Sequence, residues 1–189
     1  MKTKKTSLKK NSVSLKNKTK VASAKVANSK NANGNLTAKN KRQSTVAVLK
    51  IGVVTARFND EVTSKLEQGA LDFLESFKGA LEIYNVKVPG AVEIPLACQA
   101  LLDKGCDGVV ALGAVIRGET SHYDYVCNSV ERGVSQLMLE YKKPIGFGVL
   151  TVENDEQAMD RCGGKHGNKG YEAAQVTMEM IGLLQDLSK

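Results

Sequence analysis

The sequence predicts an α/β domain of three layers, α/β/α, in which a parallel sheet of four strands is covered by helices on both faces. Strand-like and helix-like segments alternate four times along the chain, which is typical of folds with a parallel sheet. The strand-like segments are apolar almost throughout rather than at every second position, as expected of strands buried on both faces. The 189 residues suffice for one such domain with a full core.

The first two strand–helix pairs are expected at residues 46–55, 60–77, 81–88 and 93–104. The first strand is a β-branched apolar run, and the helix after it carries apolar residues at helical spacing until Gly79 ends it. In the second strand, apolar and polar residues alternate well enough for the strand to be recognised, and Pro89 and Gly90 end it. Gly105 stops the second helix.

The second half of the domain repeats this order. A strand is expected at residues 107–116, a helix at 122–141 and a strand at 144–151. Both strands are again nearly all apolar, and the helix carries an apolar stripe that would face inward. Two further helices are expected at 154–161 and 169–187, joined by a glycine-rich segment.

Charge is distributed unevenly along the chain. The net charge is +7, but thirteen of the 27 Lys and Arg residues lie within residues 1–42, where no Asp or Glu occurs. The remaining chain has fourteen bases against 20 acids. Residues 1–44 are rich in Lys, Asn, Ser and Thr and have no apolar run, so we expect a disordered basic extension. Residues 45–189 are expected to form the folded domain.

The purpose of the basic extension is left open by its composition. A polycation of this kind could bind nucleic acid or an acidic surface, or it could be a solvated extension without a dedicated partner. It lacks the apolar segment of a secretory signal. An organelle transit peptide is an alternative, because acids are absent and Ser is frequent, although nearly all the bases are Lys.

The four cysteines show neither metal-ligand spacing nor a CxxC pair, so they are expected to be reduced and mostly buried. No apolar segment has the length of a membrane span. These observations favour a cytoplasmic protein with no membrane partner.

Ligands of parallel sheets bind beyond the carboxyl ends of the strands, and the first two ends carry unusual residues. Phe58 follows the first strand, where an exposed ring is more often a packing contact than a platform for a ligand. After the second strand, Gly90 and Ala91 keep the backbone open to an approaching molecule. Glu93 lies in the first turn of the next helix, where an acid ordinarily does no more than complement the helix dipole.

The third strand end is the richest in polar groups, with the sequence Gly-Ala-Val-Ile-Arg-Gly-Glu-Thr-Ser-His-Tyr-Asp at 113–124. A turn at 118–120 that leads into a helix offers free backbone N–H groups and a hydroxyl, which suits a phosphate. His122 lies in the first helical turn, where the dipole favours a neutral imidazole able to accept a proton. The alternative is a histidine that caps or packs locally.

Two basic features follow the fourth strand. Arg161 could bind a phosphate through two parallel hydrogen bonds. The segment 163–169 combines glycines with lysines but lacks the spacing of a Walker motif. Taken alone, each is more often a feature of the surface.

Four of these segments together resemble the lumazine synthase family. They are Ala-Arg-Phe-Asn at 56–59, Val-Pro-Gly-Ala-Val-Glu-Ile-Pro at 88–95, the segment 113–124, and Gly-Gly-Lys-His-Gly-Asn-Lys-Gly at 163–170. The resemblance runs from about Leu49 to the C-terminus. It implies a transferase of riboflavin biosynthesis, without cofactor or metal, that condenses 5-amino-6-(D-ribitylamino)uracil with 3,4-dihydroxy-2-butanone 4-phosphate. The products would be 6,7-dimethyl-8-ribityllumazine, phosphate and water.

The resemblance also implies roles for individual residues. The ring of Phe58 would stack on the pyrimidine, and His122 would donate and accept protons. The other residues that bind the pyrimidine and its ribityl chain would be Ala91, Val92, Glu93, Ala114, Val115, Ile116, Phe147 and Lys169. The sugar phosphate would be bound by Glu119, Thr120 and Arg161, the last from an adjacent subunit. Two positions depart from the family pattern: Val92 stands where an aromatic residue is frequent, and Ala114 where Thr is common.

A shared site implies an oligomer. The family forms pentamers, and members with a short link before the last helix build 60-subunit icosahedral shells; the link here is short, so a shell is expected. Two other functions remain alternatives. One is a flavodoxin-like domain that binds a flavin without transforming it, and the other is an oligomeric scaffold whose basic extension binds RNA.

Overall fold

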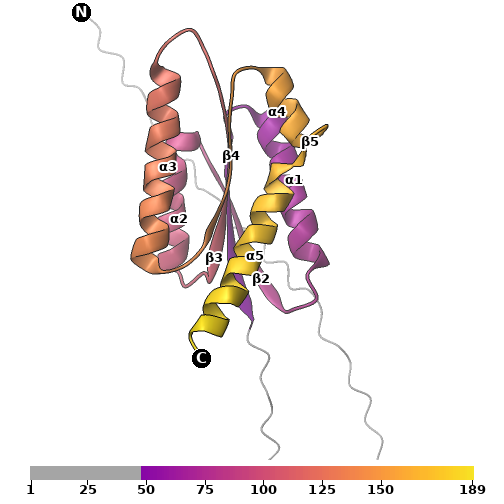
Figure 1. Ribbon diagram of the computed structural model, residues 1–189, viewed down its shortest axis with the longest axis vertical. Coiled ribbons are helices and arrows are strands. Elements are labelled where there is room, and N and C mark those ends of the chain that lie inside the picture. The colour runs from indigo at the N-terminus through magenta and orange to yellow at the C-terminus, as the bar shows by residue number, and fades with distance from the viewer. Residues whose placement is uncertain (1–47) are drawn as a thin grey trace, which may run out of the picture.

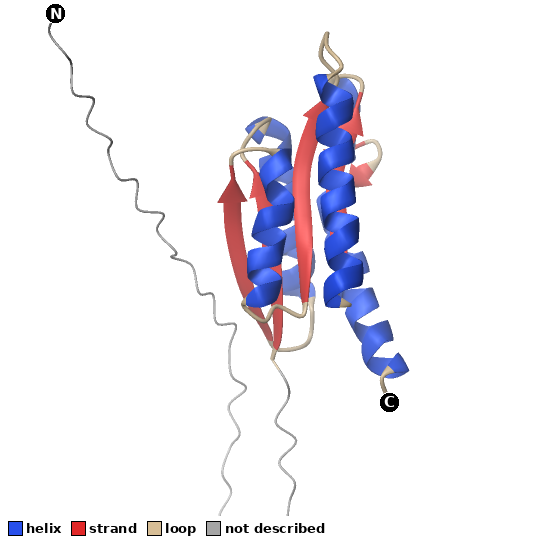
Figure 2. Cartoon of the chain, turned by 90° about the vertical axis from the view of Figure 1, so that its left-hand side faces the viewer, coloured by secondary structure: helices blue, strands red, loops and turns tan. Residues whose placement is uncertain are grey.

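The computed structural model describes residues 48–189, so the predicted extension at 1–44 lies outside the described residues. Four strands, β1 (Leu49–Ala56), β2 (Leu81–Val88), β3 (Gly108–Ile116) and β4 (Ile145–Val152), form one sheet in the order β2-β1-β3-β4. All neighbouring strands in this sheet are parallel, and Figure 2 shows their arrowheads pointing the same way. The predicted parallel sheet of four strands is confirmed.

Helices cover both faces of the sheet (Figure 1). On one face lie α1 (Asp60–Ser76), α4 (Asp155–Arg161) and α5 (Lys169–Leu187), and on the other lie α2 (Ile94–Asp103) and α3 (His122–Tyr141). This confirms the three-layer, flavodoxin-like arrangement.

Three short elements were not predicted. A single 3-10 turn, η1 (Ala91–Glu93), precedes α2, because Pro95 occupies the start of that helix and the chain must turn from β2 before it. The glycine-rich link folds as a small antiparallel hairpin of β5 (Cys162–Gly164) and β6 (Gly167–Asn168).

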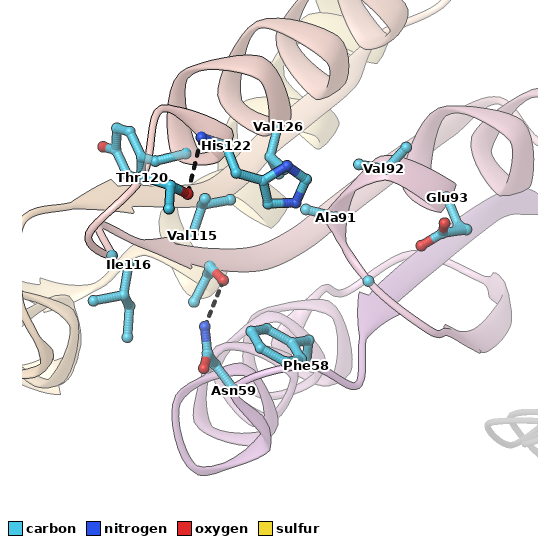
Figure 3. Close-up of a pocket in the computed structure, with 14 residues that line it drawn as sticks. Phe58, Asn59, Ala91, Val92, Glu93, Val115, Ile116, Thr120, His122 and Val126 are labelled. Atoms are coloured by element: carbon cyan, nitrogen blue, oxygen red, sulfur yellow. Dashed lines mark hydrogen bonds between the residues drawn. The ribbon is translucent and has the colours of Figure 1, made fainter.

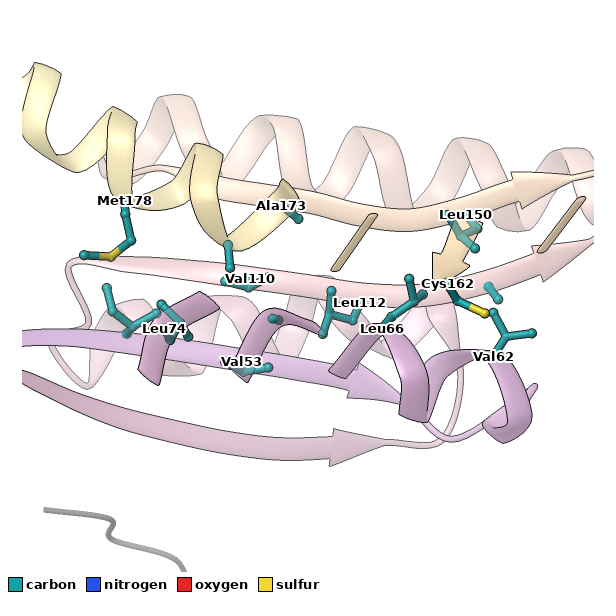
Figure 4. Packing of buried hydrophobic residues seen from close by; sticks show 14 of the residues in the cluster. Val53, Val62, Leu66, Leu74, Val110, Leu112, Leu150, Cys162, Ala173 and Met178 are labelled. Atoms are coloured by element: carbon teal, nitrogen blue, oxygen red, sulfur yellow. The ribbon is translucent and has the colours of Figure 1, made fainter. Parts of the chain in front are cut away.

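The core consists of two apolar clusters, one on each face of the sheet. Ile51 and Val53 of β1 pack toward α1 and α5, whereas Val54 packs toward α2 and α3. Figure 4 shows the first cluster, in which Leu66 and Leu74 of α1 lie against the central strands. Because both faces of β1 and β3 are buried, apolar side chains are needed at nearly every position. This is why these strands are continuous apolar runs in the sequence.

The cysteines occupy the positions expected of small apolar residues. Cys98, Cys106 and Cys162 are buried and Cys127 is half-buried, all as free thiols. Burial raises the pKa of Cys98 to about 12 and is the main cause that raises the pKa of Cys106 to about 11, so neither is a nucleophile near neutral pH. Between residues 48 and 189, no helix combines the length and apolar character that a membrane span requires.

The close packing of α5 on β4 leads to a prediction for stability. A Cβ atom at Gly146 would overlap the Ala173 carbonyl oxygen and the Thr177 hydroxyl, whereas a Cβ at Gly182 on α5 meets nothing within 4 Å. We expect Gly146→Ala to lower the free energy of unfolding by about 1–3 kcal/mol through overpacking. Gly182→Ala should raise it by about 0.5–1 kcal/mol, because alanine favours the helix. Denaturant unfolding at one fixed protein concentration measures both, and equal effects would contradict this account.

Candidate active site

The turns that follow β1, β2 and β3 meet at the carboxyl edge of the sheet and enclose a pocket of about 350 Å³. The first two turns are joined directly, because the N–H of Arg57 donates to the Val88 carbonyl (2.8 Å) and the N–H of Phe58 to the Pro89 carbonyl (3.1 Å). The pocket is lined by Phe58, Asn59, Gly90, Ala91, Val92, Glu93, Ala114, Val115, Ile116, Gly118, Thr120, His122, Tyr123 and Val126. The pocket therefore lies where ligands bind in parallel sheets.

The turn after β1 presents an uncovered aromatic ring. Phe58 is 71% exposed, so the ring is not a packing contact within the chain. The next residue, Asn59, has left-handed backbone angles (φ 60°, ψ 47°), a conformation that Asn tolerates better than most residues. Its side-chain amide donates to the Ala114 carbonyl at 2.9 Å. Asn59 thus fixes the turn that carries Phe58 to the end of β3.

The end of β3 has backbone groups that face the pocket instead of a strand. The ladder between β1 and β3 ends at Leu112, whereas β3 continues to Ile116 in register with β4. The N–H of Arg117 donates toward β4, and the carbonyl of Ala114 points to the other side, where it accepts from the Asn59 amide. Since peptide groups alternate along a strand, those of Ile116 also face the side that β1 has left.

The 3-10 turn η1 supplies the wall opposite the β3 end. Ala91, Val92 and Glu93 all line the pocket, and Val92 is 47% exposed. Gly90 is extended rather than left-handed, and a Cβ there would approach the Glu93 carboxylate at 3.2 Å. The small residue therefore leaves room for Glu93 to turn toward the pocket rim.

The amino end of α3 forms the third side of the pocket. Its N-cap residue, Ser121, makes no side-chain hydrogen bond to the helix. The N–H of His122 donates to the Thr120 hydroxyl over a long 3.4 Å, and the N–H of Asp124 donates to the Ser121 carbonyl at 3.0 Å. The first turn of this 20-residue helix thus lacks a firm cap, which leaves it suited to an anion.

The His122 side chain is placed to reach a bound molecule. Figure 3 shows its ring beside Ala91 and Val126, across the pocket from Phe58 and Asn59. His122 is exposed, which does not fit the alternative of a histidine packed locally. Glu119, predicted to contact the sugar phosphate, is exposed in the turn and is not among the lining residues. Its two neighbours in the turn, Gly118 and Thr120, do line the pocket.

Three of the predicted site residues lie elsewhere in the structure. Phe147, Arg161 and Lys169 line a separate groove of about 590 Å³ along β4, α4 and α5. Phe147 is 42% exposed, Arg161 donates to the Gln157 carbonyl at 3.0 Å, and Lys169 pairs with Glu172 at 2.7 Å. Within this chain, the predicted site is therefore in two parts, because β4 is an edge strand and the segments after it pack away from the pocket.

The chain is similar to known proteins of one family. The family model described as 6,7-dimethyl-8-ribityllumazine synthase matches residues 48–185. A relative of that name from Bdellovibrio bacteriovorus is 72% identical over 139 residues, which cover 74% of this chain and 77% of the relative. Another of that name, from Desulfovibrio desulfuricans, is 50% identical over 143 residues, covering 74% of this chain and 90% of the relative. The chain belongs to the lumazine synthase family.

For this member of the lumazine synthase family, three residues that line the pocket were not predicted as site residues from the sequence: Asn59, Tyr123 and Val126. A signal for two of them was present. Tyr123 directly follows His122, and Val126 lies four residues after it, on the same side of the helix. Burial is the main cause that raises the pKa of Tyr123, with the neighbouring Cys127 thiol acting in the same direction.

No group of three or more His, Cys, Asp or Glu side chains that could hold a metal ion is found in the part of this lumazine synthase chain that the structure describes.

Proposed function

We propose that this member of the lumazine synthase family carries out its condensation in the pocket at the carboxyl edge of the sheet. As a transferase of riboflavin biosynthesis, it joins 5-amino-6-(D-ribitylamino)uracil to 3,4-dihydroxy-2-butanone 4-phosphate. The observation that carries the site assignment is the meeting of three groups in one pocket: the exposed ring of Phe58, the free backbone at Ile116 and the uncapped turn that holds His122.

Each of these groups suits one part of the substrates. A flat pyrimidine can stack on Phe58 while its polar edge meets the backbone of β3, where Asn59 already occupies the Ala114 carbonyl. The ribityl chain extends along η1, past Glu93. The phosphate lies against the first turn of α3 and the Thr120 hydroxyl. The departures at Val92 and Ala114 leave this scheme intact, since neither side chain has to supply a polar contact.

His122 is the candidate proton carrier. The 5-amino group attacks the ketone carbonyl and water leaves to give an imine; phosphate is then eliminated, and ring closure releases a second water. Every step moves a proton, and one imidazole can serve as acid and base in turn. Holding both substrates at one rim supplies effective molarity in addition.

The pocket by itself lacks a cation for the phosphate. Among the described residues that line it, none is Lys or Arg, although a phosphate that leaves as an anion needs its charge stabilised. The groove of Phe147, Arg161 and Lys169 has two cations and no catalytic imidazole. The two parts are complementary, so we propose that the groove of one subunit completes the pocket of the next. A head-to-tail contact of this kind generates a ring when its rotation closes, and the ring that we propose is the pentamer of the family.

A shell of pentamers is a further step of the same proposal. The link between α4 and α5 is a short hairpin, Cys162–Asn168, and it is pinned in place by Asn168. The Asn168 amide donates to the Lys65 carbonyl at 2.8 Å and its oxygen accepts from the N–H of Gly170 at 2.9 Å. The short link supports an icosahedral assembly.

A cytoplasmic location is proposed from the four free thiols. The alternative of a flavin-binding domain without activity is not favoured, because the two relatives described above carry the name of the synthase.

The basic extension is proposed to act apart from catalysis, as a binder of polyanions. We expect deletion of residues 1–42 to leave the rate of lumazine formation within about twofold, because the pocket and the groove lie within residues 48–189. The full chain should be retained on heparin and elute only when salt is added, because its binding releases counterions from the polyanion. The truncated protein should not be retained. Chromatography and a rate assay on both proteins test this. An inactive truncated protein that still assembles would contradict the separation of roles.

A further inference from the structure

Arg117 ties together three segments around the pocket, although it does not line it. It follows β3 directly and begins the link to α3 that carries Thr120 and His122. Its guanidinium donates from Nη2 to Asp124 Oδ1 at 3.3 Å and pairs through Nε with Glu153 Oε2 at 2.8 Å. The same group stacks over the ring of Tyr123, with 4.0 Å from Cζ to the ring centroid.

These contacts join elements that are far apart in the sequence. Tyr123 and Asp124 are the two residues after His122 in the first turn of α3, whereas Glu153 follows β4. The backbone N–H of Arg117 also donates to the Val152 carbonyl at 2.9 Å, which seats the residue on β4. Within residues 48–189, the other hydrogen bonds of the link are local, such as that from the His122 N–H to Thr120. Arg117 is thus the polar tie of this link to β4, and it adds to the packing of Tyr123 and Val126 on the apolar cluster beneath α3.

A direct role in phosphate binding does not fit these contacts. Two carboxylates, of Asp124 and Glu153, already pair with the guanidinium, and they would repel an approaching phosphate. A mainly stabilising role for Arg117 does not fit either. Its side chain is 38% exposed, and ion pairs at the surface contribute little to the free energy of unfolding. What the contacts of Arg117 do is hold the first turn of α3 in a fixed position relative to β4.

We propose that Arg117 is a positioning residue of the active site. Its planar group holds the first turn of α3 through Tyr123 and Asp124, and so fixes the His122 ring and the free N–H groups that face the sugar phosphate. Stacking on a ring while pairing with two carboxylates requires a flat, forked cation, which lysine does not provide. The inference rests on the proposed function of His122 and of the α3 turn.

The test compares Arg117→Met, Arg117→Lys and the control Arg132→Met in the full chain. Arg132 is an exposed arginine further along α3 that makes no ion pair within the described residues. We expect Arg117→Met to lower kcat by about 10–100-fold, as small misplacements of reacting groups do. KM for the butanone phosphate should rise, while KM for the ribitylaminouracil stays within about twofold because its platform lies on other turns. Arg117→Lys should recover part of kcat.

Three outcomes would overturn the proposal: unchanged kcat in Arg117→Met, full recovery by lysine, or equal rises of both KM values. Thermal unfolding and the assembly state are measured alongside, and we expect both to match the control. If Arg117→Met does not fold, Glu153→Gln removes one tie from the β4 side and should shift kcat in the same direction by a smaller factor. His122→Ala, assayed in parallel, separates the two claims: an active His122→Ala refutes the proposed function, whereas an impaired one beside a normal Arg117→Met refutes only this inference.

Discussion

Replacing His122 with alanine is expected to lower kcat for lumazine formation by about a hundredfold. This is the lower end of what one general acid–base group contributes, because the Phe58 platform and the α3 turn still hold both substrates together. Both KM values should change little, since the imidazole moves protons and makes no contact that the substrates need for binding. The rate of product formation, followed by absorbance and fluorescence of the lumazine, measures the effect.

The chain offers a matched control for this substitution. His166 is the other of its two histidines, is exposed in the hairpin between α4 and α5, and lines neither the pocket nor the groove. His166→Ala should retain the wild-type kcat. A His122→Ala protein with normal kcat would remove the imidazole from the mechanism. A wild-type protein that is folded and assembled, yet no faster than the spontaneous reaction, would refute catalysis itself.

Much of the fold could be predicted from the sequence because its central strands are buried on both faces. Val53 and Val54 are adjacent, face opposite layers and are both fully buried, so the apolar pattern is continuous and easily recognised. The edge strand β2 is only partly covered, yet Pro89 and Gly90 mark its end. The hairpin at 162–168 was missed because glycine-rich segments carry no periodic pattern.

The sequence could predict those residues of the candidate site that directly follow the ends of strands. Phe58 and His122 come after β1 and β3, which are neighbours in the sheet, so the rule for parallel sheets brought them together. The role of Asn59 was missed, because its contact with Ala114 depends on a left-handed backbone and on the order of the strands. The position of Arg161 away from the pocket follows from β4 lying at the edge, and periodicity does not reveal strand order.

The second large effect is expected from replacing Arg161, which lies in the groove and not in the pocket of His122. Arg161→Ala should raise KM for the butanone phosphate by about 10–100-fold, as expected for loss of a charged hydrogen bond, and leave KM for the ribitylaminouracil nearly unchanged. Equal losses for both substrates would contradict a role in binding the phosphate.

Mixing the two variants tests whether the site is shared. When His122→Ala and Arg161→Ala chains are refolded together in equal amounts, about a quarter of the contacts in a head-to-tail ring should join an intact His122 to an intact Arg161 of the partner subunit. Activity at low butanone phosphate should then rise well above that of either variant alone. If both residues served the same subunit's site, no intact site could form and activity would stay at the mean of the two variants.

A second mixture guards against partial refolding, which could imitate either result. Wild-type chains mixed equally with the double variant His122→Ala/Arg161→Ala should give about a quarter of intact sites if the site is shared and about half if it is not. The two mixtures must therefore agree at a quarter for a shared site, whereas the values zero and one half belong to a site within one subunit. Because sites with a single defect keep some activity, the activity of each variant alone is measured under the same conditions and subtracted before the share of intact sites is calculated. Both shares are expressed relative to the wild-type protein refolded in the same way, and together they decide whether the site is shared.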